Sequence, residues 1–267
     1  MKTPNVSSIR QAADYLEDMG LTSIVDAAGL VSPGINDKFY TKVPYKPDLI
    51  DLARLHRFVI ENKRTTILEF GTGWSTWVLA DALSKLKLKH ADEVSNLRRN
   101  NPFELHVVDD EPHFINIAKE RLPLSIGKLV TFHEKASMMG TFNDRICTYY
   151  ESLPCVSPDL IYVDGPNQFN VSSDIGGWST RHKDMLPMAA DLLRIEHFFI
   201  PGTIVIFDGR AANARFFKTN IQRGWDYQYD VDFDQHVFVL NEKPLGPLNA
   251  NLMGFWNPQL VKHERMC

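Results

Sequence analysis

Cysteine, long apolar runs and basic clusters are all scarce in this chain of 267 residues. The three cysteines are odd in number and no two have metal-ligand spacing, which favours a reduced, cytoplasmic protein over a disulfide scaffold or a zinc site. No apolar run approaches the roughly 20 residues of a membrane-spanning helix, and the first residues lack the apolar core of a signal peptide. We therefore expect a cytoplasmic protein with no membrane partner.

The charge of the chain is nearly balanced. Its 29 basic and 33 acidic residues give a formal net charge of −4, without a long basic run. This balance argues against nucleic acid or an anionic membrane surface as the main partner. The most basic stretch, residues 85–90, has the plainer interpretation of a solvated surface.

Short apolar runs alternate with stretches of helical periodicity from residue 48 onward, which predicts a parallel sheet with helices on both faces. The last two predicted strands are joined by two residues, too few for a crossover, so they must form an antiparallel hairpin. The prediction is a doubly wound α/β fold with a mostly parallel seven-stranded sheet and a C-terminal antiparallel hairpin. Its strands are expected at 65–70, 104–109, 128–133, 159–164, 203–208, 226–232 and 235–240.

Helices are predicted where apolar residues recur every three to four positions. They cover residues 8–19, 48–62, 75–86, 112–121, 182–196 and 211–223. Residues 87–102 are predicted to form an exposed insertion, and 146–150 a short strand. The chain divides into an N-terminal helix with an irregular lid or oligomer-contact segment (1–47), an α/β domain (48–241) and a C-terminal tail packed on that domain (242–267).

Acidic residues lie at the carboxyl ends of four predicted strands. They are Glu69, Asp109, Asp164 and Asp208. In open α/β sheets the ligand crevice lies outside these strand ends, and a buried carboxylate is costly unless it is paired or faces a ligand. Any one of them could instead cap the next helix. Because four occur in register, we expect them to meet at one site.

A glycine turn follows the first of these strands. Gly71 and Gly73 let the backbone approach a ligand, and a strand that turns into a helix start is typical of nucleotide-like sites. The turn has no third glycine and no Lys or Arg to clamp a phosphate. It therefore departs from a dinucleotide fingerprint.

The segment Glu69-Phe70-Gly71-Thr72-Gly73 resembles the first motif of the class I S-adenosylmethionine-dependent methyltransferases, whose fold is Rossmann-like. The resemblance covers residues 48–241 and implies S-adenosylmethionine as the cofactor. It places Glu69 near the amino-acid end of the cofactor and Asp109 on the ribose hydroxyls, although Asp109 follows 40 residues later, a distance that the insertion 87–102 would explain. The implied cofactor-binding residues are Glu69, Gly71, Thr72, Gly73, Trp74, Ser75, Asp109, Asp110 and Asp164.

Residues 159–166 and 201–208 resemble the fourth- and fifth-strand motifs of the same superfamily. In its catechol-type members these strand ends supply metal ligands. Asp164 and Asp208 match, but Gly209 stands where an Asn would be. A divalent metal is therefore an alternative that we do not favour. Catalytic roles are instead expected for Asp164 and Asp208, and His182 is a further candidate base, with a solvent-facing histidine as the plainer alternative.

The expected acceptor-binding residues follow the fourth and fifth strands, at Trp178, Arg210, Asn213 and Arg215. Arginines at a helix start could bind an anionic group, and an exposed tryptophan suits a sugar-like acceptor. The structural alternatives are an ion pair for Arg215, a cap for Asn213 and a packed Trp178.

The resemblance implies methyl transfer to an oxygen or nitrogen of a small polar acceptor, sugar-like or anionic, by an enzyme that could be a homo-oligomer. The alternatives are a non-catalytic cofactor-binding or assembly protein with the same fold, and another nucleotide-linked transferase.

Overall fold

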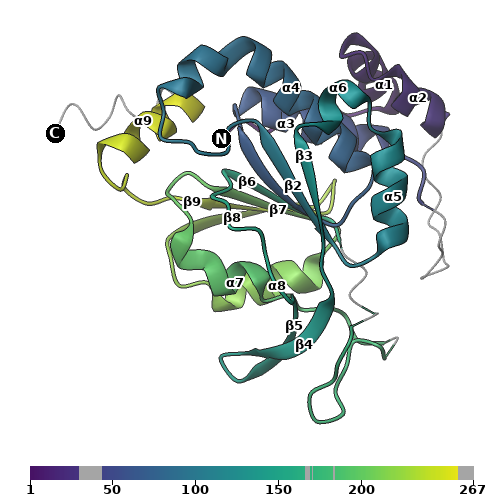
Figure 1. Ribbon diagram of the computed structural model, residues 1–267, viewed down its shortest axis with the longest axis vertical. Helices are drawn as coiled ribbons and strands as arrows, with labels where there is room; N and C mark the ends of the chain where they lie inside the picture. The colour runs from purple at the N-terminus through teal and green to yellow at the C-terminus, as the bar shows by residue number, and fades with distance from the viewer. Residues whose placement is uncertain (30–43, 166–168, 170, 183, 258–267) are drawn as a thin grey trace.

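The computed structural model of the chain describes residues 1–29, 44–165, 169, 171–182 and 184–257. Its centre is a seven-stranded sheet in the order β3-β2-β1-β6-β7-β9-β8, with helices on both faces (Figure 1). Five strands run parallel: β1 (Thr66–Phe70), β2 (Glu104–Asp109), β3 (Val130–Glu134), β6 (Leu160–Val163) and β7 (Ile204–Asp208). Strand β9 (Gln235–Leu240) is antiparallel to β7 and forms a hairpin with β8 (Trp225–Asp230). The predicted fold class is confirmed.

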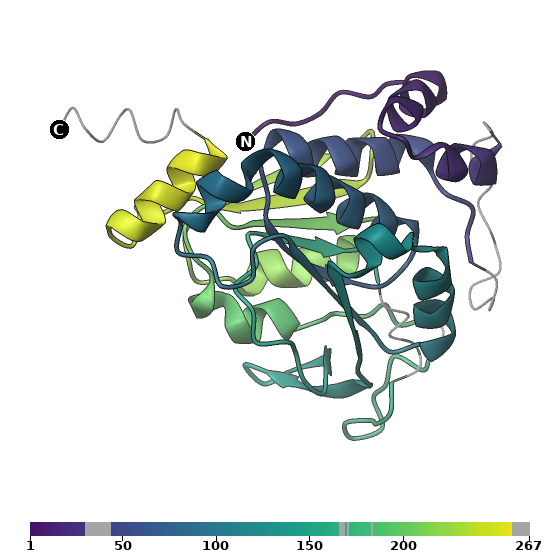
Figure 2. The ribbon, with the colours of Figure 1, turned by 45° about the horizontal axis from the view of Figure 1, so that its top comes forward.

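The helices form a layer on each side of the sheet, which Figure 2 shows almost edge-on. On one side lie α1 (Ile9–Asp18), α2 (Thr22–Ala28), α3 (Leu49–Glu61), α4 (Trp74–Ser95), α6 (Leu124–Gly127) and α9 (Pro247–Trp256). The other side carries α7 (Asp191–Ile195), a 3-10 turn (Glu196–Phe198) and α8 (Ala211–Asn220). Helix α5 (Pro112–Arg121) contacts α4 and β3 at the sheet edge.

Successive strand residues supply the two cores alternately, as the two-residue period of a strand requires. In β1, Ile67 packs with α3 and α4, whereas Leu68 and Phe70 pack with α7 and α8. Glu69 shares the face of Ile67 and therefore points toward α4. This parity decides which helix meets each side chain at the site.

Two predicted helix starts are confirmed by their caps. The Ser8 hydroxyl accepts a hydrogen bond from the Gln11 amide at the start of α1. The Asp48 carboxylate accepts from the Ile50 and Asp51 amides at the start of α3. Each cap satisfies amides that a helix N-terminus leaves without an intrahelical partner.

Several local predictions were wrong. Of the exposed insertion predicted at 87–102, residues 87–95 are instead helical, because α4 continues to Ser95 and buries Val94, and only 96–102 form a loop. The helix predicted at 182–196 begins only at Asp191, downstream of Pro187, which lacks a backbone donor. Residues 22–28, predicted irregular, form α2, and the remaining lid interpretation of 30–43 lies outside the described residues.

The region from 137 to 155 contains a separate two-stranded sheet. Strands β4 (Ser137–Phe142) and β5 (Arg145–Tyr150) form an antiparallel hairpin beyond β3, so the predicted strand at 146–150 was one half of it. The tail contributes α9, whose Trp256 lies so close to Gly202 that a Cβ there would come within 2.7 Å of the indole. Among the described residues, no helix has the length and apolarity to span a bilayer.

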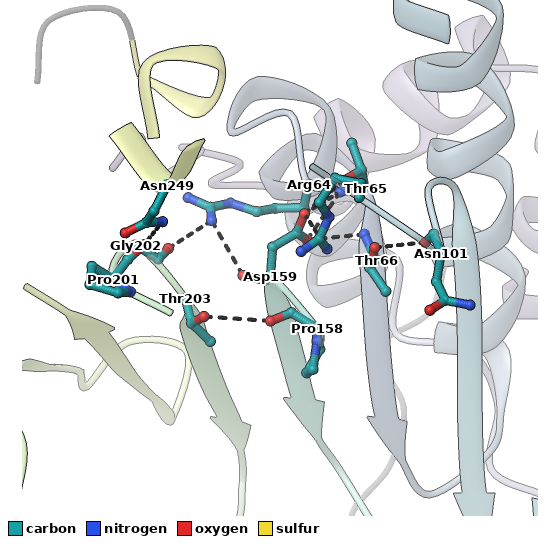
Figure 3. A network of polar contacts seen from close by, with 11 residues as sticks. Arg64, Thr65, Thr66, Asn101, Pro158, Asp159, Pro201, Gly202, Thr203 and Asn249 are labelled. Atoms are coloured by element: carbon teal, nitrogen blue, oxygen red, sulfur yellow. Dashed lines mark hydrogen bonds and ion pairs between the residues drawn. The ribbon is translucent and has the colours of Figure 1, made fainter. Parts of the chain in front are cut away.

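A polar network holds the amino ends of β1 and β6 together (Figure 3). The carboxylate of Asp159 accepts hydrogen bonds from the Thr65 and Thr66 amides and from the Thr65 hydroxyl. Arg99 donates to the same carboxylate at 3.2 Å. Several donors thus satisfy a fully buried carboxyl group, and the opposite, carboxyl edge is left to the site.

Candidate functional site

Two glycines bring the loops after β1 and β6 into backbone contact. Gly71 has a φ of 92°, in the region that favours glycine, and its amide donates to the Val108 carbonyl at 2.9 Å. A Cβ on Gly71 would lie 2.6 Å from the Gly165 Cα, and one on Gly165 would lie 2.4 Å from the Gly71 Cα. Only glycine fits at either position, so the glycine turn is fixed against the strand end that carries Asp164.

Glu69 joins strand β1 to the first turn of α4. Its side chain is fully buried and accepts hydrogen bonds from the Ser75 hydroxyl at 2.5 Å and the Thr76 hydroxyl at 2.8 Å. Burial raises its pKa to about 8, against the two hydroxyl donors, which lower it. The Ser75 hydroxyl, predicted to face the cofactor, is therefore directed at Glu69.

Asp109 joins β2 to the glycine turn. Its Oδ2 accepts from the Thr72 amide at 2.8 Å and its Oδ1 from the Glu111 amide at 2.9 Å. Burial raises its pKa to about 7, while these amides favour the charged form. The neighbouring Asp110 accepts from the Ser137 hydroxyl at 2.7 Å, and its other carboxylate oxygen is buried with no partner among the described residues.

Trp74 lies between the glycine turn and the N-terminal segment. Its indole N–H donates to the Tyr45 carbonyl at 3.1 Å, and the Arg121 guanidinium lies 4.1 Å from the ring centroid. Its ring stacks on Trp77 with the centroids 6.2 Å apart. The start of α4 is thereby tied to the residues that precede α3.

A carboxylate pair lies at the ends of β6 and β7. Tyr162 donates its hydroxyl to Asp208, and Arg210 donates to the Asp164 carbonyl at 2.5 Å with its Nε 4.0 Å from the Asp164 carboxylate. Burial and then the charge of Asp208 raise the pKa of Asp164 to about 7, and Arg210 opposes this. The Asp164 side chain is nonetheless 53% exposed, so solvent screens these charges and the shift is an upper bound.

Asp51, on the first turn of α3, lies near the carboxylates of Asp164 and Asp208, and the sequence did not predict this. Burial raises its pKa to about 8, and the charges of Asp208, Asp48 and Asp164 add to the rise. In the sequence it looked like an ordinary acidic residue near a helix N-terminus. The one signal that could have indicated its role was that a second acidic residue, Asp48, lies three positions before it. Among the described residues, no three His, Cys, Asp or Glu side chains are placed to hold a metal ion.

Other predicted residues lie outside this cluster. His182 is exposed in a turn, not at a helix start, and its Nδ1 accepts from the Asp184 amide at 3.3 Å. Asn213 is buried on α8 and accepts from the Ala189 amide at 2.9 Å, a structural contact and not an acceptor-facing one. Trp178 and Arg215 are exposed.

The carboxyl edge of the sheet thus gathers the predicted residues from four strands. The side chains or backbones brought together there are those of Glu69, Gly71, Thr72, Asp109, Asp110, Asp164, Asp208 and Arg210. This edge can offer backbone amides, an exposed carboxylate whose pKa is near neutrality, and a negative potential. Those features suit a positively charged ligand that carries hydroxyl groups.

No protein-family model and no curated protein matches the chain. Among solved structures, the O-methyltransferase TomG from Streptomyces achromogenes, in complex with SAM, is 16% identical, with 91% of this chain and 93% of that chain covered and a TM-score of 0.40. Cofactor-bound Rv0187 from MTB is 12% identical, with coverages of 91% and 100% and a TM-score of 0.48. The O-methyltransferase from Bacillus cereus in complex with SAH is 15% identical, with coverages of 90% and 92% and a TM-score of 0.38. The order and direction of its own strands, and not these distant similarities, give the chain a Rossmann-like, doubly wound fold.

Proposed function

We propose that this chain is a methyltransferase that uses S-adenosylmethionine to methylate an oxygen or nitrogen of a small polar acceptor. The observation that carries the proposal is the unit formed by the glycine turn and Asp109 beside Asp164 at the carboxyl edge. The methyltransferase-like domain would span 48–241, with 1–47 as a lid or oligomer contact and 242–267 packed against it. The net charge of −4 and unpaired Cys147 and Cys155 fit a small-molecule partner in a reduced, cytoplasmic setting.

The residues at the edge fit a sulfonium nucleoside. Each Asp109 oxygen already accepts at least one amide hydrogen bond, and a carboxylate has further lone pairs for the two hydroxyls of a ribose. The buried oxygen of Asp110, which has no partner among the described residues, could accept from a donor on the same ligand. The surrounding carboxylates would stabilise a positive sulfonium and would repel the phosphates of a dinucleotide.

S-adenosylmethionine would supply an electrophilic methyl group, and the work of the chain would be to align donor and acceptor. Asp164 is suited to accept the proton of the acceptor, because it is exposed and its pKa is raised toward the working pH, to about 7 at most. Arg210 would hold the loop of Asp164 in place, and Tyr162 would hold Asp208.

The cluster of carboxylates formed by Asp51, Asp164 and Asp208 also limits the charge of the acceptor. Asp208 and Asp164 raise the pKa of Asp51, and Asp208 raises that of Asp164, so an anionic acceptor would meet like charge there. Arg210 is already turned to Asp164. We therefore propose a neutral hydroxyl or an amine as the acceptor group and do not retain an anionic one.

Calorimetry with S-adenosylmethionine, S-adenosylhomocysteine and NAD tests the cofactor. Binding of the first two and not of NAD is the expected result, and binding of NAD alone would show that the proposal is wrong. A screen of alcohols, sugars and amines with a labelled methyl donor then tests turnover. Binding without any transfer would favour the non-catalytic alternative, and transfer of another part of the donor would favour a different nucleotide-linked transferase.

A further inference from the structure

A cavity of about 880 Å³ lies at the amino edge of the sheet, away from the glycine turn. Thr66, the first residue of β1, lines it, and the network of Figure 3 borders it. Because β1 has five residues, the two edges are separated by on the order of 13 Å at about 3.3 Å per residue. The cavity therefore centres on the opposite end of the strand from the proposed methyl-transfer site, and of its lining Tyr150 extends to the Val108 carbonyl, which also accepts from the Gly71 amide.

Four segments far apart in the sequence enclose this cavity. They are the loop 98–101, the segment 150–157, residues 191–200 around α7, and residues 245–252 at the start of α9. Large apolar side chains lie around it, including Phe198, which is 81% exposed, and the exposed Leu245 and Leu248. A cavity of ligand size with an apolar lining favours a ligand with an apolar body.

Two arginines of the lining form no ion pair among the described residues, although the charge of Arg194 acts on the buried Asp191 of the same helix. Arg98 is exposed and makes no ion pair with any of them. Arg194 contacts the face of Tyr149, with its guanidinium 4.6 Å from the ring centroid, and likewise has no ion pair in the described part of the chain. The acidic lining residues are the exposed Glu151 and the buried Asp191.

Buried polar atoms of the lining also lack partners within the described part of the chain. Arg99, whose side chain is only 4% exposed, bonds Asp159 through one terminal nitrogen and leaves its Nε without a hydrogen bond there. Asp191 is 3% exposed, and one of its carboxylate oxygens likewise has no hydrogen-bond partner among the described residues. Unpaired buried polar atoms are uncommon in folded proteins, and these two lie within the wall of the cavity, not on its surface.

We propose that this cavity is a second ligand site, for a small amphipathic carboxylate whose apolar body lies against Phe198 and Leu248 and whose anionic group is bound by Arg98 and Arg194. A guanidinium and a carboxylate match in charge and in planar geometry, which favours this anion over a cation of the same apolar body. The site does not depend on methyl transfer, and it gives the chain a place where an acyl or aryl acid binds.

Calorimetry with sodium dodecanoate, kept below the concentration at which it forms micelles, tests the site. Dodecanoate should bind with one site per chain. The Arg98→Gln, Arg194→Gln double variant should have an affinity for it that is lower by roughly tenfold or more. Arg145→Gln is the matched control, because Arg145 is exposed on the β4–β5 hairpin and does not line the cavity. It should leave the affinity unchanged. Thermal melts establish that all variants fold, and S-adenosylmethionine affinity should be the same in each.

A second readout locates the ligand without any change at the arginines. Cys155 is exposed and lines the cavity, whereas Cys147 is buried. In a Cys267→Ser background, dodecanoate should slow the reaction of Cys155 with a maleimide, and Leu248→Gln should reduce that protection.

Three outcomes would overturn the proposal. One is an unchanged dodecanoate affinity in the double variant, and another is equal binding of dodecyltrimethylammonium, which has the opposite charge. The third is binding to phosphatidylglycerol vesicles without any binding of monomeric dodecanoate, which would show that the cavity rim contacts a membrane surface instead.

Discussion

The carboxylate of Asp109 accepts a 2.8 Å hydrogen bond from the backbone amide of Thr72. This contact joins the end of β2 to the turn after β1, although the two residues are 37 apart in sequence. The residue proposed to bind the ribose therefore also shapes the turn that would lie beside the cofactor.

Asp109→Ala should lower the affinity for S-adenosylmethionine by roughly 10- to 100-fold, because it removes a charged acceptor and releases the turn. Asp109→Asn keeps one oxygen for the Thr72 amide and should show a smaller loss. Calorimetry measures both variants, with Asp92→Ala, an exposed position on α4, as the control. An Asp109→Ala variant that folds and binds S-adenosylmethionine normally would show that Asp109 does not contribute to cofactor binding.

Asp164→Asn should lower kcat by about 10²- to 10⁴-fold, the usual contribution of a general base. In the unsubstituted enzyme kcat should rise with pH at or below about 7, because the carboxylate must be deprotonated to accept a proton. The variant should lose this rise, as measured by labelled methyl transfer from pH 5 to 9. Asp144→Asn, exposed in the β4–β5 turn, should keep it. A retained pH dependence in Asp164→Asn would assign the base elsewhere.

Glu69→Gln should change the pH dependence of stability. The pKa of Glu69 in the folded protein is about 8, above its ordinary 4.5, so the folded state binds more protons between these values and stability falls as pH rises. Removing the ionisable group should flatten this fall by on the order of 2–4 kcal/mol between pH 5 and 8. Denaturant unfolding measures it, with the exposed Glu120→Gln on α5 as control. Equal slopes for Glu69→Gln and the parent would mean that Glu69 is ionised in the fold.

The sequence predicted the features that depend on local pattern. The seven strands followed from apolar runs, the start of α3 from Asp48, and the convergence of Asp109, Asp164 and Asp208 from the geometry of a parallel sheet. The glycine turn was recognised from its spacing.

The features that the sequence did not predict depend on contacts distant in the chain. Polar residues after Leu86 concealed the continuation of α4, which needs only occasional apolar positions such as Val94 to pack. Asn213 is buried because Ala189 supplies a donor from another segment. Asp51 joins the carboxylate group because α3 lies beside the ends of β6 and β7, and a single sequence does not state that proximity.

Gly71→Ala should destabilise the fold by about 2–4 kcal/mol, because a side chain there adds left-handed strain to a collision with Gly165. Gly20→Ala separates these two causes, since Gly20 has a φ of 77° and no atom lies within 4 Å of the position that a Cβ would take there. It should cost only about 1–2 kcal/mol. Thermal and denaturant unfolding measure both variants, and equal losses would show that contact between the two loops contributes nothing.

Asp159 has a consequence for strand alignment. Its carboxylate can accept from the Thr65 and Thr66 amides only while Ile67 pairs with Leu160 in the register between β1 and β6. A slip of one residue would break these bonds and turn Glu69 toward the opposite face of the sheet, away from Ser75 and Thr76. The buried Asp159 thus fixes the register between β1 and β6. Contacts at the amino edge of the sheet therefore determine which side chains lie at the carboxyl edge.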